Sequence, residues 1–186
     1  MHTQARMLTV LAALVTASMF SSQSSAEETW VRVVSHDKRA SALFPSQPDK
    51  IETVSRNSPA GTINTRRRQY QSEGVLLSLA GTKLPGAALR FASTDKILRN
   101  AAEGVLATYL GKKVSMIETK IGGEPAIVLE YRVPDYDDED HPGYRGIAIA
   151  LLVDESLYVI NAILTKEDPK AKAKQQKLLG SIQVHK

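Results

Sequence analysis

The sequence has no cysteine among its 186 residues and few histidines. Without cysteine, disulfides, thiol chemistry and a lipid-modified N-terminal cysteine are all excluded. The four histidines are His2, His36, His141 and His185. Four histidines without cysteine give little support for a transition-metal site, which needs several nitrogen or sulfur ligands. A site built from His36 and His141 would require two distant loops to meet, so surface histidines are the simpler interpretation.

The apolar run at the amino terminus is too short to cross a membrane. Arg6 precedes uncharged, mainly apolar residues 7–20, which give way to a Ser/Gln stretch, whereas a spanning helix needs about 20 mainly apolar residues. A cation, a short apolar run and small residues before a cleavage point are typical of a secretory signal peptide. We therefore expect residues 1–26 to be removed between Ala26 and Glu27, and the protein to be exported to the periplasm.

The charge balance is mild. Removing the signal peptide leaves 23 of the 24 Lys and Arg residues against 20 Asp and Glu, a formal charge of +3. A nucleic-acid-binding protein would show a concentrated basic face, whereas here the two signs are interleaved. Hydrophobic residues at 42% and charged residues at 24% are close to globular averages. We expect residues 27–186 to form one soluble domain that binds no nucleic acid and does not span a membrane.

Motifs of common catalytic and cofactor sites are missing. The sequence has no G-x-S-x-G elbow or convincing S-x-x-K pair, and the glycines at 122–123 and 143–146 lack the spacing of phosphate or dinucleotide loops. These absences favour a binding or accessory protein without catalytic activity and without a cofactor, acting on a periplasmic or envelope partner. The alternative is a cell-envelope hydrolase that uses carboxylates from distant loops.

Short apolar or alternating segments between turn residues predict antiparallel strands. The predicted strands are residues 30–34, 40–44, 51–55, 62–70, 75–80, 114–120, 126–133, 147–153 and 157–164, with an edge strand in 182–184. The segments 147–153 and 157–164 are almost continuously apolar, which is typical of central strands covered on both faces.

Two helices are predicted. Apolar residues spaced by four predict an amphipathic helix over residues 94–110, with Ser93 or Thr94 capping its start and Gly111 in a left-handed conformation at its end. A second helix begins at Asp168-Pro169 and ends at Gly180. The predicted fold class is α+β: a mainly antiparallel sheet with one long amphipathic helix and a C-terminal helix packed on it.

This pattern resembles the PsbP-like family of exported α+β proteins, which is named for an extrinsic photosystem subunit and includes bacterial periplasmic relatives. The matching features lie in the Trp30 strand, the Ala-Leu-Phe-Pro stop at 42–45 with Pro48 after it, the long helix, the strand at 157–160, and the closing Leu-Gly-Ser-Ile at 179–182. The resemblance covers most of residues 30–184. It implies a sheet with helices on its faces that serves as a binding or assembly accessory, and it carries over no catalytic residue.

The segment 135–140 concentrates acidic side chains. Its candidate ligands for a hard cation such as calcium are Asp135, Asp137, Asp138, Glu139 and Asp140, with His141 beside them. The spacing is not that of an EF-hand loop, which needs a glycine at its sixth position and an acid at its twelfth. A solvated turn between two strands is therefore the favoured interpretation.

One basic cluster stands out at Arg66, Arg67 and Arg68. On a strand, Arg66 and Arg68 would share a face and Arg67 would point the opposite way. The cluster could bind an anionic headgroup, a polysaccharide or an acidic partner. The alternative, which we favour, is an edge strand that charge protects from unwanted pairing.

Overall fold

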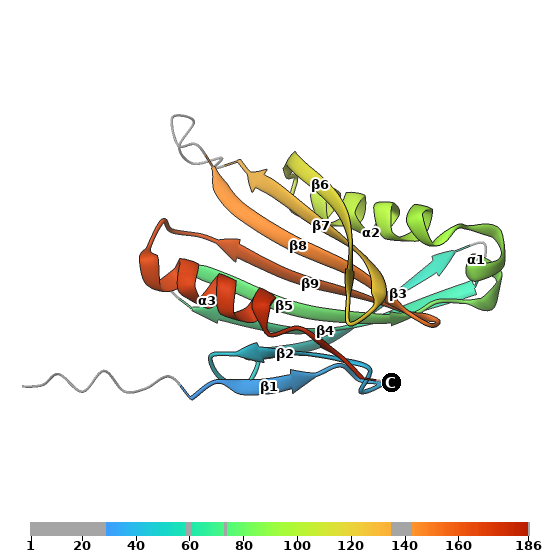
Figure 1. Ribbon diagram of the computed structural model, residues 1–186, viewed down its shortest axis with the longest axis horizontal. Coiled ribbons are helices and arrows are strands. Elements are labelled where there is room, and N and C mark those ends of the chain that lie inside the picture. The colour runs from blue at the N-terminus through green and yellow to red at the C-terminus, as the bar shows by residue number, and fades with distance from the viewer. Residues whose placement is uncertain (1–28, 59–60, 73, 135–142, 186) are drawn as a thin grey trace, which may run out of the picture.

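The computed structural model describes residues 29–58, 61–72, 74–134 and 143–185, which form ten strands and three helices (Figure 1). The strands are β1 (Val31–Val34), β2 (Ala40–Phe44), β3 (Lys50–Ser58), β4 (Gly61–Ser72), β5 (Val75–Lys83), β6 (Lys112–Ile121), β7 (Glu124–Val133), β8 (Tyr144–Val153), β9 (Ser156–Leu164) and β10 (Gln183–Val184). The helices are α1 (Gly86–Phe91), α2 (Thr94–Thr108) and α3 (Pro169–Gly180). The α+β fold class is confirmed.

Seven antiparallel strands form the main sheet, in the order β3-β4-β5-β9-β8-β7-β6. Strands β9 and β8 lie in its interior, and most of their residues are buried. Their continuous apolar sequences are explained by this position, since both faces of a central strand are covered. The prediction of central strands is confirmed.

A second, smaller sheet is made by β1, β2 and β10. Strands β1 and β2 form an antiparallel hairpin, with Val33 opposite Ala42, and β10 pairs with the other edge of β2. We expected a single sheet, and that was wrong. Buried Ala40, Ala42 and Phe44 show the reason, because β2 lays its apolar side chains on the face of the main sheet.

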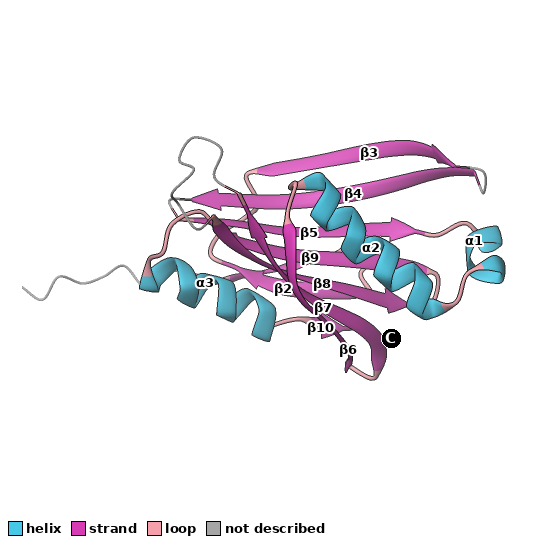
Figure 2. Ribbon diagram, turned by 90° about the horizontal axis from the view of Figure 1, so that it is seen from above, coloured by secondary structure: helices cyan, strands magenta, loops and turns pink. Residues whose placement is uncertain are grey.

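Helix α2 covers the opposite face of the main sheet, over β7 and β8 (Figure 2). The Ser93 hydroxyl accepts a hydrogen bond from the Lys96 N–H, as predicted for the cap. The helix ends at Thr108, and the left-handed residue is Leu110 (φ 51°), not Gly111. Gly111 is required for a different reason, since a Cβ there would lie 2.7 Å from the Tyr131 ring.

Helix α3 packs on β9, β5 and β2. Its start is as predicted: the Asp168 carboxylate accepts from the Lys170 N–H, and Pro169 opens the first turn. Helix α1 was not predicted, because its six residues include no buried side chain and therefore give no periodic apolar signal.

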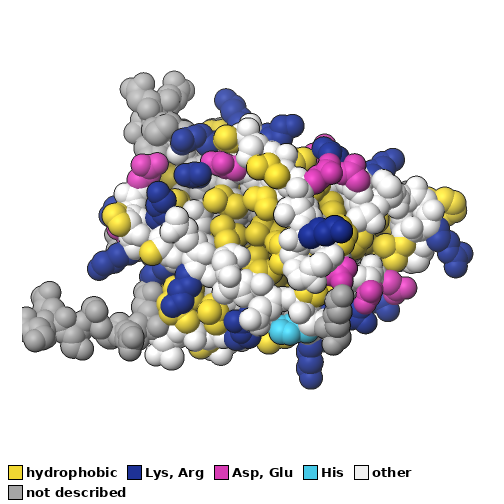
Figure 3. Space-filling view, in the orientation of Figure 1, with side chains coloured by type: hydrophobic (Ala, Val, Ile, Leu, Met, Phe, Trp, Pro, Cys, Tyr) yellow, Lys and Arg dark blue, Asp and Glu magenta, His cyan; other side chains and the backbone are white. Residues whose placement is uncertain are grey.

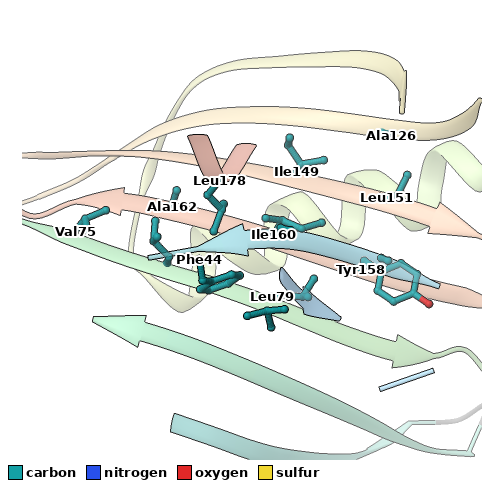
Figure 4. Packing of buried hydrophobic residues seen from close by; sticks show 14 of the residues in the cluster. Phe44, Val75, Leu79, Ala126, Ile149, Leu151, Tyr158, Ile160, Ala162 and Leu178 are labelled. Carbon is teal, nitrogen blue, oxygen red and sulfur yellow. The ribbon is translucent and has the colours of Figure 1, made fainter. Parts of the chain in front are cut away.

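The core therefore has two parts, one on each face of the main sheet. One part joins α2 to the sheet. The other joins α3 and the small sheet to the opposite face, where Leu178 of α3 and Phe44 of β2 lie over Ile160 (Figure 4). Sheet and helices thus form three layers.

Candidate interaction surfaces

The turn between β1 and β2 is fastened to β9 by one carboxylate. Asp37 accepts hydrogen bonds from the hydroxyls of Ser35 (2.7 Å), Ser156 (2.8 Å) and Tyr158. Partial burial opposes ionisation of Asp37, but the hydrogen bonds from Tyr158, Ser35 and Ser156 outweigh it, so its pKa lies below the usual value. Every one of these contacts is internal to the fold, which assigns Asp37 a structural role.

Tyr158 is the central donor of this cluster. Burial, followed by the hydrogen bond to Asp37, raises the pKa of Tyr158 to about 12. The phenol therefore stays protonated and keeps donating near neutral pH.

The arginine cluster lies on β4, the second strand of the sheet, so the expectation of an edge strand was wrong. Arg67 is directly opposite Glu52 of β3, and its Nε donates to the Glu52 carboxylate at 2.7 Å. Arg66 and Arg68 are on the other face, and Arg66 contacts the exposed ring of His36. Among the described residues, Arg68 makes no ion pair. Anion binding by this cluster therefore stays a prediction, and it would involve the face that Arg66 and Arg68 share.

The acidic segment from Asp135 to Asp140 and the adjacent His141 lie outside the described residues. Within the described part of the chain, no group of three or more histidine and acidic side chains could hold a metal ion. His185, which directly follows β10, lies with its Nε2 2.8 Å from the Ser41 hydroxyl of β2.

Two open cavities lie at loops. The first lies where β5 leads into α1, and its Glu155 carboxylate is 3.7 Å from Lys83 Nζ. The second lies at the start of α3 and combines Lys166, Lys170 and Lys174 with Glu167 and Asp168. The lining of the first cavity contains one carboxylate, Glu155, and in the second cavity the Asp168 carboxylate already caps α3. Among the described residues, neither cavity therefore offers two unengaged carboxylates facing each other.

An apolar surface lies where α3 and the small sheet leave the main sheet uncovered. We call it the β6–β8 face and define it by Ile117 of β6, Val128 of β7, and Ile147 of β8. Ile117 is opposite Val128, and Val128 is opposite the buried Ile149, so these side chains form one row across three strands. Ile117 is 60% exposed, and Val128 and Ile147 are half-buried. Figure 3 shows apolar side chains gathered at the centre of this side of the molecule.

Charged side chains border this face at one end. Glu130 lies next to Ile147 in the register and forms an ion pair with Arg145, with Arg145 Nη2 2.8 Å from Glu130 Oε1. One row further, Arg132 is opposite both Lys112 and Arg145. The Arg145 Nε is buried and has no hydrogen-bond partner among the described groups. The border is therefore predominantly basic.

Sequence reasoning missed this face and also the exposed aromatic at Phe91, which is 88% exposed on α1. An exposed isoleucine in an alternating strand looks the same in the sequence as a buried one. Its exposure depends on where α3 and the small sheet end, and no local pattern reports that.

The chain resembles solved structures in shape, although no protein-family model and no curated protein sequence matches it. The solution structure of cyanobacterial PsbP (CyanoP) from Synechocystis sp. PCC 6803 aligns with a TM-score of 0.51. The alignment covers 90% of this chain and 99% of the other, at 15% identity. The fold is PsbP-like.

A second similar structure is PA94 from Pseudomonas aeruginosa, a protein of unknown function, with a TM-score of 0.39 and 13% identity over 81% of this chain and 93% of the other. The alignment with cyanobacterial PsbP confirms, at the level of a PsbP-like fold, the resemblance inferred from Trp30, residues 42–45 and the long helix. In the part of the chain that the structure describes, no helix is both long and apolar enough to cross a membrane.

Proposed function

We propose that this chain is an exported accessory protein, without catalytic activity of its own, that binds a partner protein in the periplasm or at the cell envelope through the β6–β8 face. The observation that carries the proposal is Ile117, a large apolar side chain that is 60% exposed and in register with half-buried Val128. Apolar surface shared by neighbouring strands is typical of interaction sites when polar residues rim it.

The border of the face indicates the chemistry of the partner. Lys112, Arg132 and Arg145 lie opposite one another in one row across β6, β7 and β8, and Glu130 is the carboxylate that pairs with Arg145. A partner with an apolar side chain for Ile117 and a carboxylate for the basic row would complement this face.

The proposal that the protein is exported is supported by residues 1–26, which have the sequence pattern of a signal peptide. The PsbP-like fold supports the absence of catalysis only indirectly, because a fold hosts many functions. The hydrolase alternative gains no specific support from the two open cavities.

Photo-crosslinking in intact cells tests the proposal. A crosslinking amino acid at position 117 is expected to give one protein adduct of constant mass, which excess wild-type protein suppresses and Ile117→Asp protein does not. The matched control places the same amino acid at position 91, where exposure is higher. Suppression by both competitors alike, or the same adduct from both positions, would contradict the proposed face.

A further inference from the structure

The edge strand β3 is open for pairing. It is the first strand of the main sheet, pairs on one side with β4, and has no partner on the other side among the described strands (Figure 2). It runs for nine residues without proline or a register shift, and Ile51 and Val54 are 67% and 40% exposed. A long regular edge of this kind is a template for another strand.

The opposite edge is protected. Strand β6 has a register shift between Lys113 and Ser115, which is a β-bulge. A bulge bends the strand and interrupts its regular donors and acceptors, which disfavours pairing. The two edges therefore differ, and β3 is the one suited to strand addition.

In one antiparallel register, charged side chains of β3 lie opposite charges of the other sign on a second copy of β3. Lys50, Glu52, Val54 and Arg56 occupy alternate positions and therefore share a face. When two antiparallel copies are centred on Val54, each Glu52 lies opposite Arg56 of the second copy, and the two-fold symmetry repeats the pair. Glu52 already pairs with Lys50 and Arg67 of its own chain, whereas Arg56 is exposed and has no ion pair among the described residues, so this register gives Arg56 a carboxylate to share.

Other centres lose this complementarity. Centring on Thr53 sets Lys50 against Arg56 of the second copy, and centring on Glu52 sets two carboxylates against each other. Centring on Ser55 leaves Glu52 opposite Ser58. Like charges directly opposite destabilise a strand pair, whereas opposite charges stabilise it.

We propose that two copies of this chain associate by antiparallel pairing of β3 with β3, centred on Val54, which joins two seven-stranded sheets into one continuous sheet. The surface is self-complementary, as a two-fold interface requires. The inference goes beyond the proposed function, because β3 and β6 are opposite edges of the sheet and can be occupied together.

The absence of cysteine allows a clean test in the full chain. In the proposed dimer, Val54→Cys places two thiols opposite each other, with Cα atoms at a separation of about 4.5–5.5 Å that a disulfide can span. Mild oxidation is expected to give a covalent dimer. The control Ile117→Cys, on the other edge, is expected to stay monomeric on denaturing gels. Equal crosslinking of the two variants would overturn the proposal.

A charge reversal tests the register without a new bond. Arg56→Glu puts two Glu–Glu pairs in the interface and is expected to raise the dimer dissociation constant about tenfold or more by sedimentation equilibrium. The control Arg90→Glu, on exposed α1, is expected to leave it unchanged. A wild-type chain that remains monomeric at high concentration, or equal effects of the two reversals, would overturn the proposal.

Discussion

The phenol of Tyr158 donates a hydrogen bond to the carboxylate of Asp37, and this contact joins the central strand β9 to the turn between β1 and β2. The two residues are far apart in the sequence, so their contact fixes the small sheet on the main one. Ser35 and Ser156 donate to the same carboxylate. The polar cluster around Asp37 and the apolar packing of Phe44 both hold the small sheet on the main sheet.

Removing the acceptor of this cluster is expected to destabilise the fold. Asp37→Ala leaves the hydroxyls of Tyr158 and Ser156 without their partner, which costs about 2 kcal/mol of unfolding free energy, whereas Tyr158→Phe costs about 1 kcal/mol. Urea unfolding of the two variants and of the double variant measures the coupling. Additive effects of the two substitutions would contradict the described contact.

The same carboxylate is expected to make stability depend on acid. The pKa of Asp37 is lower in the folded protein than in the unfolded chain. Its stabilisation is therefore complete above the unfolded value of about 3.9 and is lost as pH falls through the lower folded value. As the pH falls below about 4, the wild-type protein is expected to lose more stability than Asp37→Asn. Parallel pH profiles of the two proteins would contradict this assignment.

Gly146 is expected to be intolerant of substitution. A Cβ at this position would lie 2.3 Å from Cζ of the buried Tyr131, whose hydroxyl donates to Asn161. Gly146→Ala is expected to cost about 1–3 kcal/mol because the ring cannot move without losing packing.

The matched control is Gly104→Ala. Gly104 lies within α2, and a Cβ there meets no atom within 4 Å. This substitution is expected to stabilise the protein by about 0.5–1 kcal/mol, because alanine is the better helix former. Thermal unfolding compares the two variants. A Gly146→Ala protein as stable as the wild type would show that Tyr131 does not pack on Gly146.

The arginines of β4 are expected to differ in their contribution to anion binding. Arg67 is neutralised by Glu52, whereas Arg66 contacts a histidine and Arg68 makes no ion pair among the described residues. Arg66→Gln/Arg68→Gln is therefore expected to shorten retention on a heparin column more than Arg67→Gln does. A larger effect of Arg67→Gln would contradict the described ion pair.

Millimolar calcium is expected to leave the melting temperature unchanged, because the acidic segment from Asp135 to Asp140 lacks the spacing of an EF-hand. A ligand that binds the folded state would raise the melting temperature. A rise that Asp137→Asn/Asp138→Asn abolishes would instead support the cation-site alternative.

Much of the fold could be predicted because its signals are local. Each of these elements is predicted by its own residues: the helix starts by the caps at Ser93 and Asp168, and the central strands by the unbroken apolar residues of β8 and β9. Strand order is not local. The separation of β1, β2 and β10 into a second sheet depends on β2 packing over the main sheet, which no spacing along the chain encodes.

The arginine strand and the β6–β8 face illustrate the same limit. An exposed polar strand such as β4 has the composition of an edge, yet it lies inside the sheet because β3 pairs with it and occupies the edge. Ile117 is exposed, whereas α3 packs mainly on β9, β5 and β2. Both facts arise from packing between distant segments.

The most direct test of the proposed function is the size of the protein's assemblies in cell extract, measured by size-exclusion chromatography of the tagged wild type, Ile117→Asp and Phe91→Asp. The β6–β8 face predicts that the wild type and Phe91→Asp elute in a complex larger than two copies of the chain, and that Ile117→Asp is released from it. Elution of all three proteins at the same volume would contradict a partner bound through Ile117.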